Sequence, residues 1–336
     1  MKKNSFLKDK KAIFIGTSIM LEKCIEFSLK KFKNIYVLTD DKKIIKKLKN
    51  KINLVNIKDL KKINFDYLFS ILNHRIIPYK VLKNVKQTCF NFHDGPLPRY
   101  AGLFSSSWAI INNEKTHGVT WHKITKKIDA GDIVASKKFK IKKNDTSYSL
   151  DIRSILIGIK LFKTLIKKID KNSFSSKKQN LRKRTYFGKN EIKRLIKEYN
   201  LKKENNSLTR ALTLSPQKNY LIEKLVGKKI NISNKIMTSK KDKSKSYQNK
   251  NFIKLIDLLG KVINFNFKIN KVDDSKLEEM SLNNHPKWDS LAHVKLLSVI
   301  EKKFKVTINE ANIDKFSNIK SIFNFLSKKG KLNQLN

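Results

Sequence analysis

The chain has 336 residues, an apolar fraction of 40% and a formal net charge of +47. This length is enough for two domains, and no run approaches the ~18 consecutive apolar residues of a membrane span. The basic N-terminus lacks an apolar segment closed by a small-residue cleavage site, so we predict a soluble, cytoplasmic protein with no membrane partner.

The positive charge comes almost wholly from lysine. Only seven of the 75 Lys and Arg residues are arginine, the residue that phosphate and base recognition favours. Lysine, asparagine and isoleucine are abundant together, as in proteins from AT-rich genomes. We therefore interpret the charge mainly as composition, which argues against a dedicated nucleic-acid surface. The segment 177–203 is nevertheless a candidate basic patch.

The first part of the chain alternates apolar strands with helical patterns. Strands are expected at 11–16, 34–40, 52–57, 67–72 and 88–93, with helices at 18–32 and 41–51. Such alternation predicts a Rossmann-like α/β fold, in which helices cover both faces of a parallel sheet. Gly16-Thr17-Ser18 is not a GxGxxG fingerprint, so a dinucleotide site is poorly supported.

The chain then continues through a helix after Gly102, a turn at 113–117, a pair of strands around 129–132, and a long amphipathic helix capped near Thr146. Beyond Ile169 the composition becomes polar and basic, and 237–251 is rich in Lys and Ser. We therefore predict a catalytic domain at 1–170, a short basic C-terminal subdomain at 171–236, a flexible linker at 237–251, and a small helical domain at 252–330.

The sequence gives little evidence for a metal site or a disulfide bond. Cys24 and Cys89 each lie in an apolar stretch, which is typical of buried, reduced thiols. No set of His, Cys, Asp and Glu has metal-ligand spacing, so no metal is predicted.

Polar side chains stand where buried strands are expected to end. Asn91 and His93 close one strand, and Asn73 and His74 follow another. Because ligands of open α/β sheets bind at the carboxyl ends of strands, these positions are candidates for a site. The alternative is that they are strand-end residues reaching solvent, and that Asp129 merely caps a tight turn.

Four motifs in order carry a resemblance to a known family. They are Asn91-x-His93, Pro96-Leu97-Pro98-Arg99-Tyr100-x-Gly102, HGVTWHKI at 117–124, and Ile128-Asp129-Ala130-Gly131-Asp132-Ile133. Over roughly 11–169 the chain resembles the folate-dependent formyltransferases, which act on methionyl-tRNA, glycinamide ribonucleotide, amino sugars and peptide-synthetase substrates. The sequences of these motifs are most similar to the synthetase-associated and sugar-modifying branch of the family.

The resemblance implies 10-formyltetrahydrofolate as co-substrate and Asn91, His93 and Asp129 as the catalytic trio. The residue types suit formyl transfer to an amine. Asn91 can donate its amide to the formyl oxygen, and His93, on the same strand face at i+2, can donate as well or move a proton. Asp129 can orient the imidazole or accept the amine's proton through water. His117 and His122 are expected to be structural or to face the substrate.

The loop that binds the pterin in the family is matched by LNHRIIP at 72–78. The implied cofactor-binding residues are Leu72, Asn73, His74, Arg75, Pro78 and Asp132.

The C-terminal segment resembles an acyl carrier protein, a small all-α domain of four helices. Asp289-Ser290-Leu291 opens an expected helix, and the resemblance implies that Ser290 carries 4′-phosphopantetheine. The implied partners are a phosphopantetheinyl transferase and an acyl- or aminoacyl-loading enzyme acting in trans. An ordinary Ser N-cap is the alternative. The net charge of +5 over 251–329, from 14 Lys against 9 acidic residues, departs from the acidic character of carriers.

Four functions are compatible with these patterns. The first is formylation of a primary amine, either tethered to the carrier or on an amino sugar. The second is methionyl-tRNA formylation, which would make tRNA a partner. The third is hydrolysis of 10-formyltetrahydrofolate. The fourth is basic nucleic-acid binding without catalysis, which has no need of Asn91 or Asp129.

Overall fold

The computed structural model describes residues 6–201, 206–214, 218, 222–223, 250–263, 288, 290–309 and 312–335. The chain forms two compact units, Met1–Leu212 and Thr213–Asn336, and each is described here by itself.

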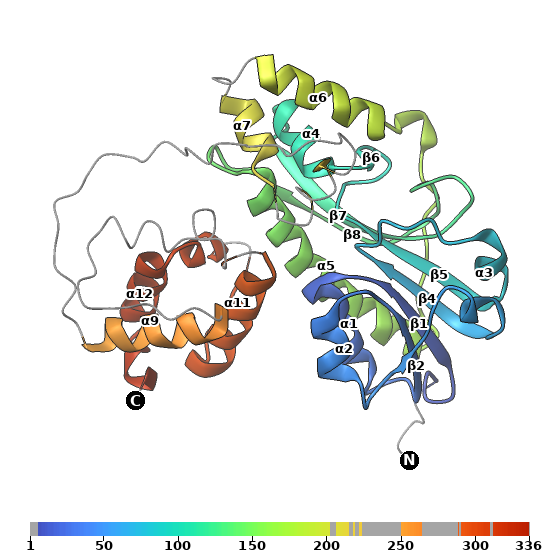
Figure 1. Cartoon of the computed structure of the whole chain (residues 1–336), viewed down its shortest axis with the longest axis horizontal. Coiled ribbons are helices and arrows are strands. Elements are labelled where there is room, and N and C mark those ends of the chain that lie inside the picture. Colours follow the sequence, from blue (N-terminus) through green and yellow to red (C-terminus); the bar gives the residue numbers. More distant parts are fainter. Residues whose placement is uncertain are drawn as a thin grey trace. The chain divides into compact units, whose positions relative to one another are not determined.

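A seven-stranded sheet organises the first unit (Figure 1). Its spatial order is β3-β2-β1-β4-β5-β7-β8, and its strands are β1 (Lys11–Gly16), β2 (Asn34–Leu38), β3 (Asn53–Leu54), β4 (Phe65–Ile71), β5 (Val85–His93), β7 (Thr116–Lys123) and β8 (Ile133–Lys140). The strands from β3 to β5 are parallel, whereas β7 and β8 are antiparallel to their neighbours.

The prediction of a parallel sheet is therefore right for most strands and wrong at one edge. The reason lies in the connection after β5. His93 at the end of β5 pairs with Thr120 in the middle of β7, and Phe90 pairs with Lys123 at the end of β7, so the chain re-enters the sheet from the end at which it left. No crossover returns it to the opposite end, and the new pair must be antiparallel.

Some helices of the first unit connect the strands of this sheet, and others come after its last strand in the sequence. They are α1 (Ser18–Ser28), α2 (Lys42–Leu48), η1 (Asp59–Lys61), α3 (Tyr79–Lys83), α4 (Ser105–Ile111), α5 (Ser147–Asp170), η2 (Leu181–Lys183), α6 (Lys189–Leu201) and α7 (Asn206–Leu212). Two short strands, β6 (Ala101–Gly102) and β9 (Tyr186–Phe187), pair with each other in parallel.

The long helix α5 begins as predicted. The Thr146 hydroxyl accepts a hydrogen bond from Ser149 N, and the Ser149 hydroxyl accepts one from Thr146 N, which together form a capping box. Further along, the Trp121 indole donates to Gly158 O at 3.0 Å. The helix therefore lies close against β7, and α1 packs beside it on the same face of the sheet (Figure 1).

The two faces of β5 carry different kinds of side chain. Phe90 and Phe92 point toward the face covered by α5, where Phe92 contacts Trp121 and Phe90 stacks on Phe69. Because side chains alternate along a strand, Asn91 and His93 point to the opposite face. The fold thus anchors this strand with aromatic packing on one side and presents polar groups on the other.

The turn between β1 and α1 is built for close packing. Gly16 has a φ of 142°, and a Cβ there would lie 1.8 Å from Ile71 O. The glycine is required because the backbone of β4 passes so near.

The second unit contains α9 (Lys250–Ile263), α11 (Ser290–Phe304), η3 (Ile313–Phe316), α12 (Ile319–Lys328) and η4 (Leu332–Leu335). Its core includes Trp288, whose indole donates to His293 Nδ1 at 3.0 Å, and burial lowers the pKa of His293 to about 3. Residues 237–249 of the expected linker and 264–287 of the expected carrier lie outside the described residues, while Lys250 and Asn251 belong to α9.

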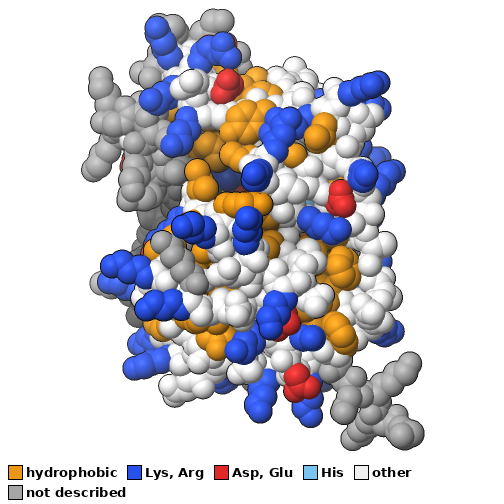
Figure 2. Space-filling model, turned by 90° about the vertical axis from the view of Figure 1, so that its right-hand side faces the viewer, with side chains coloured by type: hydrophobic (Ala, Val, Ile, Leu, Met, Phe, Trp, Pro, Cys, Tyr) orange, Lys and Arg blue, Asp and Glu red, His pale blue; other side chains and the backbone are white. Residues whose placement is uncertain are grey.

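Charge is spread broadly over the surface. On the face shown in Figure 2, Lys and Arg side chains are scattered rather than gathered into one stripe. Within the described part of the chain, no helix combines the length and the apolar character needed to cross a membrane.

Candidate active site

Four polar side chains from three elements meet on the face of the sheet opposite α5. Asn91 and His93 come from β5, His122 from β7 and Asp129 from the loop between β7 and β8. The antiparallel register places His122 directly opposite Asn91. The structure therefore brings together the three residues of the predicted trio and adds a second histidine.

Hydrogen bonds hold the His93 ring in one orientation. Its Nε2 lies 2.7 Å from Tyr100 O, and since a carbonyl oxygen only accepts, Nε2 carries the hydrogen. The other nitrogen, Nδ1, faces Asp129 Oδ2 at 3.7 Å. That separation exceeds hydrogen-bond length, so a backbone carbonyl rather than Asp129 sets the tautomer and orientation of His93.

Asp129 occupies an unusual backbone conformation. Its φ is 53°, in the left-handed region that non-glycine residues rarely adopt. Its Oδ2 accepts a hydrogen bond from Gly102 N at 2.9 Å, and its Oδ1 lies 3.4 Å from His122 Nε2. A backbone held in a sparsely populated region beside two histidines is typical of a functional position.

The environment keeps Asp129 charged. Burial by itself would raise the pKa of the carboxyl group, whose side chain is 10% exposed. The neighbouring His93 and His122 and the Gly102 amide favour the carboxylate more strongly, and they lower its pKa to about 2.

His122 connects the amide of the site to its carboxylate. Its Nδ1 donates to Lys123 O at 2.8 Å, which leaves Nε2 facing Asn91 Nδ2 at 3.1 Å and Asp129 Oδ1 at 3.4 Å. A neutral ring accepts from the Asn91 amide, whereas a protonated ring donates to the carboxylate. The sequence interpretation left His122 out of the catalytic trio and expected it to be structural or to face the substrate. The signal was the HGVTWH strand, in which an antiparallel pairing with β5 sets His122 beside Asn91.

The loop matched to the family's pterin site follows β4, the parallel neighbour of β5. Leu72 has a φ of 46°, the Asn73 side chain bonds Arg75 N and O, and the Arg75 guanidinium pairs with Asp40. His74 and Arg75 are exposed, and Pro78 precedes α3. The start of this loop lies next to the end of β5, but none of these contacts reaches the four-residue cluster.

The contacts of Asp132 are with residues outside the cluster. Its carboxylate is 3.4 Å from Lys123 Nζ and accepts a hydrogen bond from Ser176 at 3.2 Å. These partners are at the edge of the sheet, where β8 begins.

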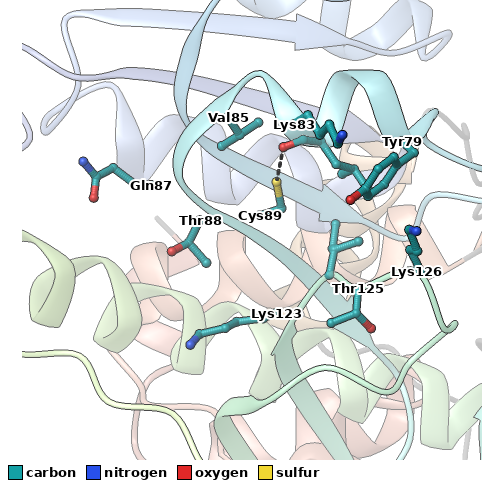
Figure 3. Close-up of a pocket in the computed structure, with 11 residues that line it drawn as sticks. Tyr79, Lys83, Val85, Gln87, Thr88, Cys89, Lys123, Thr125 and Lys126 are labelled. Carbon is teal, nitrogen blue, oxygen red and sulfur yellow. Dashed lines mark hydrogen bonds between the residues drawn. The ribbon is translucent and has the colours of Figure 1, made fainter.

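A pocket of about 360 Å³ lies along β5, toward the start of that strand from the cluster, and none of the four cluster residues lines it (Figure 3). Its lining contains apolar, hydroxyl and lysine side chains, among them Leu82, Ile124, Tyr79, Thr125 and Lys126. Cys89, two residues before Asn91 on the same face of β5, also lines it. The Cys89 thiol points toward Leu82 O, and burial raises its pKa to about 12, which excludes a thiolate at neutral pH.

Comparison with known proteins agrees with this geometry. The family model described as Formyl transferase matches residues 22–162. The chain is 44% identical over 102 residues to the bifunctional polymyxin resistance protein ArnA of Wigglesworthia glossinidia brevipalpis, covering 30% of this chain and 16% of that protein. It is 32% identical over 123 residues to methionyl-tRNA formyltransferase of Thermodesulfovibrio yellowstonii, covering 37% and 40%. The chain thus spans less than half the length of these relatives.

Solved structures share the fold. The sugar 3N-formyltransferase WlaRD, in a crystal structure with dTDP and 5-N-formyl-THF, is 26% identical with a TM-score of 0.51, covering 71% of this chain and 87% of that one. The N-formyltransferase of Helicobacter canadensis is 23% identical with a TM-score of 0.53, covering 71% and 93%. Taken with the order of the motifs and the cluster at the end of β5, these matches lead to one conclusion: over residues 22–162 the chain is similar to the formyl transferase family, whose model it matches there.

Proposed function

We propose that this protein transfers a formyl group from 10-formyltetrahydrofolate to a primary amine. The observation that carries the proposal is the cluster of Asn91, His93, His122 and Asp129. In it an amide donor, two imidazoles and a carboxylate held in its charged form are linked by three contacts of 3.1, 3.4 and 3.7 Å. This set can polarise a carbonyl and remove a proton at the same place.

Each residue has a distinct role in this chemistry. The Asn91 amide carries two hydrogens; His122 Nε2 accepts one, and the second can donate to the formyl oxygen as negative charge develops there. His93 Nδ1 lies 3.7 Å from Asp129 Oδ2, so an amine placed beside the pair can direct an N–H to both acceptors. A proton leaving the amine is then held between an imidazole nitrogen and a carboxylate.

The residues present fit a folate. When bound, the folate supplies the formyl carbon. The pocket along β5, which the cluster residues do not line, has a volume in the range of small-molecule sites, about 300–1,000 Å³, and mixes apolar walls with hydroxyl and amide groups. The predicted loop at 72–78, in which Ile76 is 86% exposed, supplies an apolar side chain near the start of α3. Leu72, Asn73, His74, Arg75, Pro78 and Asp132 are proposed to contact the cofactor.

For the acceptor we favour an amino sugar. WlaRD, which resembles this chain over most of its own length, acts on a sugar and was crystallised with dTDP and a formyl-folate. A methionyl-tRNA acceptor has support from the relatives of that name, but they match this chain only in part.

A carrier-tethered amine is the second candidate. The helix α11 begins at Ser290 and runs for 15 residues, as expected of a carrier helix whose first residue bears the prosthetic arm. We propose that Ser290 is the 4′-phosphopantetheine attachment site, served by a phosphopantetheinyl transferase. A tethered amine would reach the site at an effective concentration in the millimolar range.

The test is a transfer assay with the full chain and 10-formyltetrahydrofolate labelled in the formyl group. The acceptors are a dTDP-amino sugar, methionyl-tRNA, the phosphopantetheinylated protein loaded with an amine, and water. Labelled formamide product on the sugar supports the favoured reading, and label on another acceptor selects that one. His93→Ala and Asp129→Ala should each lower the rate roughly 100-fold or more. Parent-like rates in both variants would show that the cluster is not catalytic.

A further inference from the structure

The segment 176–187 contacts both loops that build the active site. We call it the strap. It follows α5 and lies beyond the family match at 22–162. Its backbone first pairs with the edge of the sheet, where Lys177 and Ile133 exchange two hydrogen bonds of 2.8 Å.

The strap then holds the loop that carries Asp129. Gln179 Nε2 donates to Asp129 O at 3.0 Å and to Gly131 O at 2.6 Å. Arg184 Nη2 donates to Ile128 O at 3.0 Å. Three carbonyls of one short loop are therefore bound by two side chains from the same neighbouring segment.

The far end of the strap holds the loop that orients His93. Tyr100 N donates to the Thr185 hydroxyl at 2.8 Å, and Ala101 N donates to Thr185 O at 3.0 Å. The ring of Phe187 stacks on Trp108 with a centroid distance of 4.5 Å and on Tyr100 at 5.7 Å. Tyr100 O is the acceptor for His93 Nε2, so this contact also bears on the imidazole.

The Asp129 loop needs such support. Asp129 adopts a positive φ, a conformation that persists only where surrounding contacts impose it. The neighbouring Gly131 is packed so tightly that a Cβ would lie 1.9 Å from Lys123 O. The loop is thus held in a conformation that its own backbone preferences do not select.

We propose that Gln179 is a positioning residue that holds Asp129 against His93 and His122, an inference that rests on the proposed formyl transfer. Both hydrogens of its amide are used on the loop carbonyls, while its Oε1 is buried without a hydrogen-bond partner in the described structure. A rotated amide would set Oε1 against two carbonyl oxygens. The orientation of the side chain is therefore dictated by the loop it supports.

The test compares Gln179→Glu, in which an oxygen replaces the donor nitrogen at nearly constant shape, with Gln179→Leu. Lys178→Gln, at an exposed neighbouring position of the strap, is the matched control. We expect both Gln179 variants to lower kcat roughly 10-fold to 100-fold, because small misplacements of a catalytic group have effects of that size. The KM for 10-formyltetrahydrofolate should change less than about twofold, and the control should match the parent. If Gln179→Glu does not fold, Gln179→Leu decides.

A second measurement does not depend on turnover. At neutral pH and well below the melting temperature, the ring ¹H–¹³C signals of His93 and His122 should shift in the Gln179 variants and stay in place in Lys178→Gln. Parent-like kcat and unmoved signals in a folded Gln179 variant would overturn the proposal. If the parent transfers no formyl group, the proposed function fails, and the imidazole signals still decide whether Gln179 positions the cluster.

Discussion

A carboxylate that is nine-tenths covered by protein would usually bind a proton more readily than one in water, yet Asp129 does the reverse. Two imidazoles, where they are protonated, and one amide N–H favour its charged form enough to outweigh burial. The shift from an ordinary pKa of 3.8 to about 2 corresponds to about 2 kcal/mol of folding stability. This residue therefore contributes to stability as well as to chemistry.

The pH dependence of that contribution has a definite sign. Because the pKa of Asp129 is lower in the folded state, the stabilisation is present above about pH 4 and is lost as the pH falls toward 2. The unfolding free energy of Asp129→Asn should be about 2 kcal/mol below that of the parent at pH 7. Urea denaturation at pH 7, 5, 4 and 3 should show this gap shrinking at the acid end. An equal gap at pH 7 and pH 3 would contradict the assignment of charge.

The cluster was partly predictable because two of its members share a strand. Asn91 and His93 are two residues apart, so strand alternation alone puts them on one face. Asp129 and His122 come from segments whose distance from β5 depends on sheet order, which spacing does not encode. His122 enters the site through the antiparallel pairing of β5 with β7, the feature that a parallel-sheet prediction leaves out. The Gln179 contacts depend on a segment with no recognisable motif.

At the scale of elements, the packing of α5 against the sheet supports the site from the opposite face of the sheet. Gly158 is the point of closest approach, where a Cβ would lie 2.4 Å from Phe92 Cε2 and 2.7 Å from Met20 Cε. Phe92 stands between Asn91 and His93 in the strand, so displacement of its ring would disturb both. A helix without a side chain at this place lets the strand lie flat against it.

Substitution of this glycine sets two effects against each other. Gly158→Ala gains about 1 kcal/mol of helix propensity, but the added methyl overpacks a core site, which costs typically 1–3 kcal/mol. We expect overpacking to prevail and the unfolding free energy to fall by roughly 1–2 kcal/mol. Lys167→Ala, at an exposed position of the same helix, should change it by less than about 0.5 kcal/mol. Equal or greater stability in Gly158→Ala by urea denaturation would mean that α5 can move away from β5.

The strands β1, β2, β4 and β5 and the helix α5 were predictable because their apolar patterns are long and regular. Their observed bounds, such as Lys11–Gly16 for β1 and Ser147–Asp170 for α5, agree closely with the expected segments. The prediction of a parallel sheet was wrong for β7, which runs against both β5 and β8, since its direction depends on where the chain goes after His93. The pairing of β6 with β9 joins residues about 85 apart and has no local signal.

At the scale of the whole molecule, the catalytic unit runs further than its motifs. The first unit extends to Leu212 and includes the strap, α6 and α7, whereas the recognisable motifs stop before α5 ends. A fragment 1–212 should therefore gain melting temperature on binding folinic acid, by mass action. A fragment 1–169 lacks every strap contact to the two loops and should gain much less. Equal shifts in the two fragments would show that the strap has no part in forming the site.

The second unit gives a separate prediction. The intact protein, co-expressed with its phosphopantetheinyl transferase, should gain about 340 Da, the mass of the arm, at Ser290. Ser290→Ala should gain nothing, and mass spectrometry of the intact chain and of its peptides distinguishes the two. An unmodified Ser290 in protein from the native host would remove the carrier-tethered amine from the candidates and leave the amino sugar.

The position of the strap along the chain has a consequence for biosynthesis. At roughly 5–20 residues per second of translation, the last strap residue, Phe187, leaves the peptidyl transferase centre on the order of 5–20 seconds after His93. The sheet can begin to assemble from the first emerged segments, but the Tyr100 and Asp129 loops lack their strap contacts until the strap follows. We therefore expect a nascent chain to begin forming its sheet before the backbone of the Asp129 loop is held in place.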